Sequence, residues 1–307
     1  MIRSPRGAYV ALVVLTIIWG TNWLVMKAAL GHADAISYNI ARTLFAVAAL
    51  FAAMLVRGVP LKPQSWSAIV VTGFFQTTLN MGSTTLALAS GGAGRTSVLV
   101  FTMPFWTLLL AWPVLHERIR GAQWIAVACA LAGLTLVVEP WNWRDAITPK
   151  LWAVLSGFGW AAGTVATKYY QRAKNLDMLS FIAWQMAVGI VPFLVLPFVL
   201  ELPGSDWSAA YVLLIVHTGV VSTAIGFLLW IGVLRWLSAG SASLNMLAIP
   251  VIALVGSMAF FGERVTATEW SGIAAIGVGL ALVSLHAWRS ARADPRDATP
   301  TPVIEAG

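Results

Sequence analysis

Charged residues are scarce in this sequence. Asp, Glu, Lys and Arg make up 10% of the 307 residues, and hydrophobic residues make up 59%. Charged residues account for about 25% of a typical soluble domain. The mean hydropathy is +0.81. These values exclude a soluble globular protein and indicate an integral membrane protein.

Carboxylates are absent from the middle of the long apolar segments, since all twelve Asp and Glu residues fall in predicted loops, tails or helix ends. No buried carboxylate is therefore available to exchange an organic cation for protons. A membrane-embedded enzyme is also disfavoured, because such enzymes need clustered Asp, Glu, His or Ser side chains and the four His residues are scattered. The single cysteine, Cys129, excludes an internal disulfide and a thiolate metal cluster. We expect neither a cofactor nor a bound metal.

The apolar residues gather in ten segments with short connections. A bilayer core about 30 Å thick is crossed by roughly 20 helical residues, and the segments lack the alternation expected of transmembrane β-strands. We therefore predict an all-α protein with transmembrane helices near 8–30, 35–56, 66–90, 93–115, 122–138, 151–170, 178–200, 207–237, 239–261 and 270–288.

Basic residues are distributed unequally between the two sides of the predicted membrane. With the N-terminus inside, the cytoplasmic segments hold Arg3, Arg6, Arg57, Lys62, Arg118, Arg120, Arg172, Lys174, Arg235, Arg289, Arg292 and Arg296, and the outer ones only Arg95, Arg144, Lys150 and Arg264. This positive-inside bias predicts that both termini are cytoplasmic. The net charge of +7 then orients helices and gives no reason to expect nucleic-acid binding.

The two ends of the chain differ in character. Residues 1–30 have a basic start and an apolar run, as a signal peptide does. That run is too long for a signal peptide, and a second span follows at once, so we expect a retained first helix. The tail at 289–307 is polar and rich in proline, which predicts disorder.

An internal duplication organises the chain. Residues 91–138 align without a gap on 237–284 at an offset of 146, and the preceding parts align at an offset of 141, with Trp19 on Trp160. Identical pairs at the first offset include Pro104/Pro250, Glu117/Glu263, Arg118/Arg264, Trp124/Trp270 and Gly133/Gly279. The residue pattern of each copy predicts an apolar helix with a proline near its middle, a Glu-Arg turn and a second apolar helix. Because five crossings bring a chain to the opposite side, the two halves have opposite orientations, as in many secondary transporters.

Two motifs accompany the duplication. One is the Trp-Gly-Thr-Asn stretch at 19–22, and the other is the Pro, Glu-Arg, Trp and Gly pattern that ends each half. In these features nearly the whole chain resembles the drug/metabolite transporter superfamily, EamA type. The resemblance implies ten transmembrane helices as two inverted five-helix repeats, at 8–139 and 150–288. It implies a basket whose central cavity is lined by helices 1, 3, 4, 6, 8 and 9, in the bacterial inner membrane. The Trp-rich composition, with 16 Trp residues, is similar to that of bacterial aromatic amino-acid exporters.

Polar side chains within the predicted spans are candidates for substrate binding, because an unpaired polar group in hydrocarbon is costly. The candidates are Asn22, Gln76, Asn80, His217 and Asn245. Gln76 and Asn80 are four residues apart and share a helical face, and His217 aligns with Gln76 in the repeat. Hydrogen bonding between helices is the alternative explanation for each of them.

Trp19 and Trp160 fall near the middle of their spans, where an interfacial aromatic belt does not explain them. The belt explains most other tryptophans, Trp23 among them. The central pair would form aromatic walls against which a flat solute stacks, or would simply pack the bundle.

Arg42 lies about two turns into the second span, where its side chain would hold a carboxylate or a backbone carbonyl. Lys27 and Arg95 lie nearer to helix ends, and their ammonium and guanidinium groups are expected to snorkel to the membrane interface. Pro104 and Pro250 each remove a helical hydrogen bond, which suggests hinges for gating or static kinks.

The sequence thus predicts a secondary transporter that exports aromatic or other hydrophobic amino acids from the cytoplasm by alternating access. Its partners would be a small-molecule solute and the lipid bilayer, with no nucleic acid, and the unit would be a monomer. A predicted cavity close to neutral favours a zwitterion over a phosphorylated sugar. The alternatives are export of other metabolites or drugs, such as threonine-like amino acids or planar toxic compounds, a membrane-embedded enzyme, and a scaffold.

Overall fold

The computed structural model describes residues 4–116, 121–139, 141, 146–173, 176–234 and 248–293, and regular structure in these residues is helical throughout. In the first half of the chain the elements are α1 Pro5–Ala29, α2 Ala35–Val56, α3 Trp66–Thr72, η1 Gly73–Met81, α4 Gly82–Ser90, α5 Ala93–Val100, α6 Met103–Leu115 and α7 Ala122–Val138. In the second half they are α8 Ile147–Ala173, α9 Met178–Gly189, α10 Val191–Val195, η2 Leu196–Phe198, α11 Ala209–Ile215, η3 Val216–Ile225, α12 Gly226–Leu234, α14 Ala248–Phe261 and α15 Ala267–Ala293.

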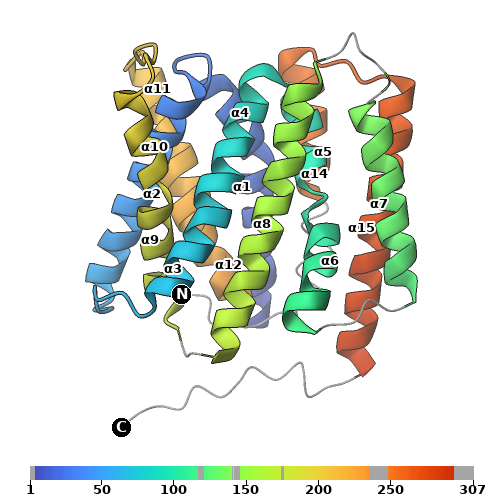
Figure 1. Ribbon diagram of the computed structural model, residues 1–307, viewed down its shortest axis with the longest axis horizontal. Coiled ribbons are helices and arrows are strands. Elements are labelled where there is room, and N and C mark those ends of the chain that lie inside the picture. The colour runs from blue at the N-terminus through green and yellow to red at the C-terminus, as the bar shows by residue number, and fades with distance from the viewer. Residues whose placement is uncertain are drawn as a thin grey trace.

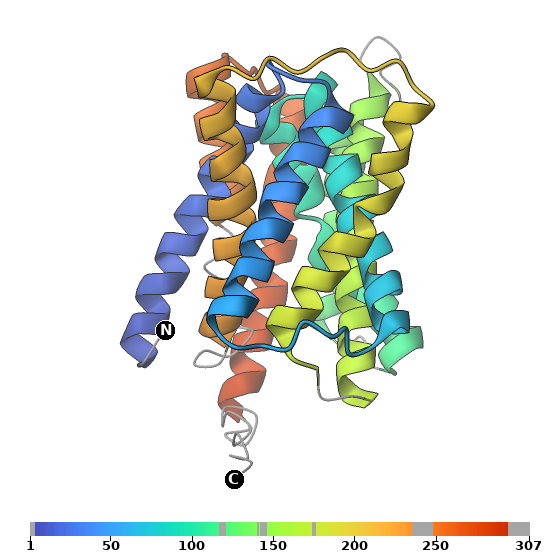
Figure 2. The same cartoon turned by 90° about the vertical axis from the view of Figure 1, so that its left-hand side faces the viewer.

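The helices stand side by side in one bundle, and α1 begins at the end of the bundle where α15 finishes (Figures 1 and 2). Five helical segments of the described residues are long and apolar enough to cross a membrane: 6–29, 35–56, 93–115, 178–198 and 209–230. Three shorter apolar helical segments cover 123–138, 248–261 and 267–282. The helical architecture and the apolar lengths are those of a multi-pass membrane protein.

Within the described residues helices occur where the sequence predicts them, but several of them differ in their interiors. The predicted helix at 93–115 is divided, because α5 ends at Val100 and α6 begins at Met103. The prediction of a proline near the middle of a helix is therefore wrong for Pro104, which lies in the first turn of α6. Proline is well tolerated there, since the first N–H groups of a helix have no intrahelical acceptor. Pro250 lies in the first turn of the described part of α14.

Two long helices contain π-helical segments that the sequence does not predict. The π-helix η1 joins α3 to α4, and the π-helix η3 joins α11 to α12. A π-helical segment widens the turn and changes which residues share a face, and such segments are frequent at functional sites. η1 packs against α8 and α9, and η3 packs against α2 and α1.

Cations close the C-terminal ends of three helices. The Lys27 ammonium donates to the carbonyl oxygens of Leu88, at 2.6 Å, and Gly91, at 2.8 Å, at the end of α4. Lys150 donates to the Val138 carbonyl at the end of α7, and Arg172 donates to the Leu115 carbonyl at the end of α6. These carbonyls carry the negative end of the helix dipole, so a cation there is favourable. Lys27 is in the last turn of α1, and its ammonium group is held by these two carbonyl groups.

The α7 and α15 helices pack along each other (Figure 1), with glycine at the closest approach. A Cβ atom on Gly272 of α15 would lie 2.7 Å from the Gly133 carbonyl oxygen, and one on Gly133 would lie 2.5 Å from the Gly272 carbonyl oxygen. Small residues allow membrane helices this separation. A side chain at either position would push the two backbones apart.

We expect Gly272→Ala to destabilise the protein by about 1 to 3 kcal/mol, the usual cost of overpacking. The added methyl group would meet the backbone of α7, which cannot change rotamer to avoid it as a side chain could. The matched control is Gly277→Ala in the same helix, where a Cβ atom meets nothing within 4 Å. At that position the substitution should be neutral or stabilising by up to about 1 kcal/mol, the helix-propensity difference. Thermal denaturation in detergent measures both. Equal melting temperatures for the two variants would contradict this account of the contact.

Candidate functional site

A cavity of about 120 Å³ lies inside the bundle. Its walls come from α1, η1 and α4, the junction of α5 with α6, α8, η3 and α12, and α14. Those elements correspond to the helices 1, 3, 4, 6, 8 and 9 expected from the sequence. The structure adds α2, which contributes Arg42. The cavity therefore gathers residues from both halves of the chain.

Three aromatic rings form one side of the cavity. Trp19 of α1 and Trp160 of α8 both line it, and Phe227 of α12 lies between them. The Phe227 ring centroid is 6.2 Å from that of Trp19, edge to face, and 6.0 Å from that of Trp160, tilted. These are favourable separations for aromatic pairs. The two tryptophans thus contact a common ring and form one continuous apolar surface.

The Trp19 ring is fixed in position. Its indole N–H donates to the Ser222 carbonyl oxygen at 2.9 Å, in the η3 segment. A Cβ atom on Gly226 would lie 2.6 Å from the Trp19 Nε1 atom, so only glycine leaves room for the indole there. Because its only hydrogen-bond donor is already used, Trp19 offers the cavity an apolar face.

Asn80 and Thr84 are polar residues of the cavity wall. The Asn80 amide nitrogen donates to the Ser156 carbonyl oxygen at 3.0 Å and lies 2.9 Å from the Ser156 hydroxyl, which in turn is 2.6 Å from the Thr84 hydroxyl. These contacts join η1 and α4 to α8. Asn80 therefore links helices and borders the cavity at the same time.

Asn22, Met26 and Arg42 form a corner of the cavity. The Asn22 amide nitrogen lies 3.1 Å from the Met26 sulfur, while its Oδ1 atom is buried and has no hydrogen-bond partner among the described residues. The guanidinium of Arg42 lies 3.4 Å from the Thr223 hydroxyl and 3.7 Å from the Met26 sulfur. The cavity wall carries this positive charge, so the prediction of a nearly neutral cavity is wrong.

Other residues proposed from the sequence lie elsewhere. Gln76 packs against α8, where its amide nitrogen is 3.5 Å from the Thr164 hydroxyl, and neither Gln76 nor His217 lines the cavity. Pro104 and Pro250 are each next to a lining residue, Met103 and Ile249 respectively, without lining it themselves. Asn245 falls outside the described residues, as do the Glu117-Arg118 turn and the tail from residue 294.

Sequence reasoning missed Phe227, Trp23 and Met26. Trp23 is 8% exposed and lines the cavity, so its assignment to an interfacial belt is wrong. A signal was present, because residues 19, 22, 23 and 26 follow the spacing of one helical face. All four of them line the cavity.

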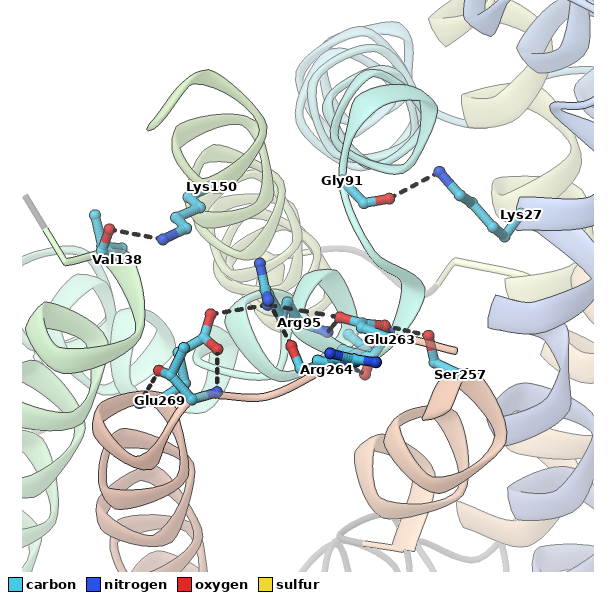
Figure 3. A network of polar contacts seen from close by, with 12 residues as sticks. Lys27, Gly91, Arg95, Val138, Lys150, Ser257, Glu263, Arg264 and Glu269 are labelled. Atoms are coloured by element: carbon cyan, nitrogen blue, oxygen red, sulfur yellow. Dashed lines mark hydrogen bonds and ion pairs between the residues drawn. The ribbon is translucent and has the colours of Figure 1, made fainter. Parts of the chain in front are cut away.

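One end of the bundle is closed by a polar network (Figure 3). Glu263, in the loop between α14 and α15, accepts hydrogen bonds from the backbone N–H groups of Gly94, at 2.9 Å, and Arg95, at 3.1 Å, in the first turn of α5. Its carboxylate also contacts the Ser257 hydroxyl. A carboxylate at a helix N-terminus interacts favourably with the unsatisfied N–H groups.

Arg95 extends the network to α15. Its Nε atom lies 2.8 Å from a carboxylate oxygen of Glu269, which is 1% exposed, and its Nη2 atom donates to the Arg264 carbonyl at 2.7 Å. The other Glu269 oxygen accepts from the Thr266 N–H, and the Thr266 hydroxyl accepts from the Glu269 N–H. This reciprocal pair is a capping box at the start of α15. Arg95 thus joins the first turn of α5 to the start of α15 through Glu269, a buried carboxylate at a helix end.

The sequence of the chain matches the EamA-like transporter family twice, over residues 6–139 and 148–285. The chain belongs to this family. It is a membrane transporter of the drug/metabolite transporter superfamily, and the family gives no indication of an enzyme.

Curated relatives of this EamA-family chain span almost its whole length. One is the "Uncharacterized transporter YoaV" of Bacillus subtilis, 24% identical, with 83% of this chain and 89% of the relative covered. Another is a "Probable amino-acid metabolite efflux pump" of Salmonella typhimurium, 25% identical, with 90% and 94% covered. A solved crystal structure matches with a TM-score of 0.64 at 21% identity, covering 93% of this chain and all of the other. The last comparison supports the fold alone.

We expect Glu263→Gln to weaken the closed end of the transporter, because a neutral amide has one acceptor oxygen where the carboxylate uses both. Hydrogen bonds to a charged group are worth about 1.5 to 3 kcal/mol each, so thermal stability in detergent should fall by an amount of that order. Glu201→Gln, at an exposed position in the loop before α11, is the control and should leave stability unchanged. Equal stabilities of the two variants would show that the carboxylate of Glu263 contributes nothing.

Proposed function

We propose that this chain exports aromatic and other hydrophobic amino acids from the cytoplasm by alternating access through the central cavity. The observation that carries the proposal is the composition of the cavity wall. The rings of Trp19, Phe227 and Trp160 form an apolar surface that suits a flat side chain, and the groups of Asn22, Asn80 and Arg42 lie in the same cavity. A site of this kind combines a large apolar surface with a few polar groups that set orientation.

The proposed architecture is ten spans in two inverted five-helix repeats, over residues 8–139 and 150–288. Three findings support it. The family matches once in each half, and each half has a π-helical segment within its third long helix. The packing is also reciprocal, because α8 of the second half packs on η1 and α6 of the first, while α1 of the first half packs on α12 and α14 of the second. Inverted repeats of this type place the binding site where the two halves meet.

The proposed orientation places both termini in the cytoplasm of a bacterial inner membrane. The network around Glu263 and Arg95 lies at the end of the bundle opposite the start of α1 (Figures 1 and 3). In this orientation the network is extracytoplasmic, and breaking it would be part of opening the cavity outward. Two relatives carry names that refer to amino-acid metabolite efflux, which supports the same direction and solute class.

The test is solute counterflow in liposomes that contain the purified chain. Labelled tryptophan and phenylalanine should exchange faster than threonine, because an aromatic side chain gains contact with the three rings. Trp19→Ala and Trp160→Ala should each slow tryptophan exchange about 2- to 10-fold, the range given by 0.5 to 1.5 kcal/mol per aromatic contact.

The matched control is Trp270→Ala, since Trp270 is 44% exposed near the start of α15 and outside the cavity. This variant should exchange tryptophan at the wild-type rate. If threonine exchanges as fast as tryptophan, or if both cavity variants exchange tryptophan at the wild-type rate, the two tryptophans are packing residues. The chain would then export other small metabolites.

A further inference from the structure

Arg42 is a buried cation in the wall of the central cavity. It is 8% exposed, although it belongs to α2, which the family resemblance does not place at the cavity. Arg42 lies seven residues after the helix start at Ala35, so at about 1.5 Å per residue it lies roughly 10 Å along the helix. That depth places it in the hydrocarbon core of a membrane, where a charged side chain is costly and usually functional.

The other cations that the bundle encloses all have strong partners. Arg95 is paired with Glu269, and Lys27 and Lys150 donate to carbonyl groups at helix ends. Arg42 differs from them. Within the described residues its guanidinium lies 3.4 Å from the Thr223 hydroxyl and 3.7 Å from the Met26 sulfur, and it interacts with the Tyr38 hydroxyl, all of which are uncharged partners.

Among the described residues, only His32 and Arg95 form ion pairs with carboxylates. No carboxylate of these residues therefore lies within 4.0 Å of the Arg42 guanidinium. Tyr38, one turn earlier on α2, offers its hydroxyl to the Arg42 guanidinium but no negative counter-charge. A buried charge without a counter-ion is unfavourable. The guanidinium therefore has donors available for a group that enters the cavity.

The shape of the guanidinium and the composition of the wall define that group. Arginine presents a planar fork of N–H donors that matches a carboxylate in a bidentate manner. Among the described residues the cavity wall contains one cation and no carboxylate, so it suits a single negative charge better than a phosphate dianion. An ammonium group finds only neutral acceptors there, such as the unpartnered Oδ1 atom of Asn22.

We propose that Arg42 binds the carboxylate of the transported solute, and that the cavity accepts aromatic monocarboxylates whether or not they carry an amino group. This proposal rests on the proposed function for the aromatic part of the solute. It goes further in making the carboxylate the essential polar group and the amine a dispensable one.

The experiment measures binding of four probes to the purified full chain in detergent, by the rise in its melting temperature with probe concentration. The probes are L-tryptophan, with carboxylate and amine, indole-3-propionate, with the carboxylate only, tryptamine, with the amine only, and indole, with neither. The first two should bind about 10- to 100-fold more tightly than the last two, as expected for loss of a charge-assisted pair.

Variants identify the residue responsible. Arg42→Gln should weaken binding of both carboxylates by the same 10- to 100-fold factor, and Arg42→Lys, which keeps the charge but loses the fork, should give an intermediate effect. Arg57→Gln is the matched control, since it removes an exposed arginine at the end of the same helix. Without probe, Arg42→Gln should melt at or above the wild-type temperature, because it removes an unpaired buried charge, whereas a purely structural arginine would leave the variant less stable.

The outcomes separate this proposal from the proposed function. If carboxylate probes bind through Arg42 but tryptophan shows no counterflow, Arg42 is a carboxylate-binding residue and amino-acid export is contradicted. If tryptophan shows counterflow but tryptamine or indole binds as tightly as indole-3-propionate, export is supported and the role of Arg42 in binding the carboxylate is overturned. Binding of none of the four probes would overturn it as well, and the comparison of probes on the wild-type chain decides the question even if Arg42→Gln does not fold.

Discussion

The absence of water in the bilayer core is the constraint on which this structure depends. Every backbone N–H and carbonyl group there must find a partner within the protein, which favours helices and permits irregular backbone only where protein or a cavity surrounds it. The described residues follow this rule. Helix α5 ends at Val100 beside the central cavity, and α6 begins at Met103, so this break within an apolar segment borders the cavity. The ends of other helices are closed by the side chains of Lys27, Lys150 and Glu263.

Hydrophobic burial cannot drive association between apolar helices in lipid, so packing depends on close approach and on polar contacts. Gly133 and Gly272 bring α7 and α15 together. Within the central part of the bundle, a Cβ atom on Gly159 of α8 would lie 3.0 Å from backbone atoms of η1. The same close approach brings Asn80 within hydrogen-bonding distance of Ser156. The geometry of the cavity therefore follows from where the chain has small residues, as well as from the residues that line it.

The sequence was sufficient to predict the helical class, most helix ends and a cavity shared by the two halves. It placed Trp19, Asn22, Arg42, Asn80 and Trp160 at the site, and all five line one cavity. Gln76 was assigned to the same face as Asn80 on α-helical spacing, but η1 is π-helical there, which changes the phase along the helix. The position of Phe227 between two tryptophans, and the lack of a counter-ion for Arg42, depend on contacts between residues far apart in the chain. Such contacts have no local signature in a single sequence.

Alternating access, as proposed here, needs two kinds of contact between the same helices. Contacts within each moving unit must survive the motion, and the backbone approach of α7 to α15 suits this role, because lipid tails do not replace packing as close as that between Gly133 and Gly272. Contacts that close an end must break and re-form. Those of Glu263 with the first turn of α5 suit this role, because water that enters as the end opens can hydrogen-bond to the carboxylate and to the freed N–H groups. A polar closure is therefore less costly to open than an apolar one of equal area, and its position at the end of the bundle gives water direct access to it.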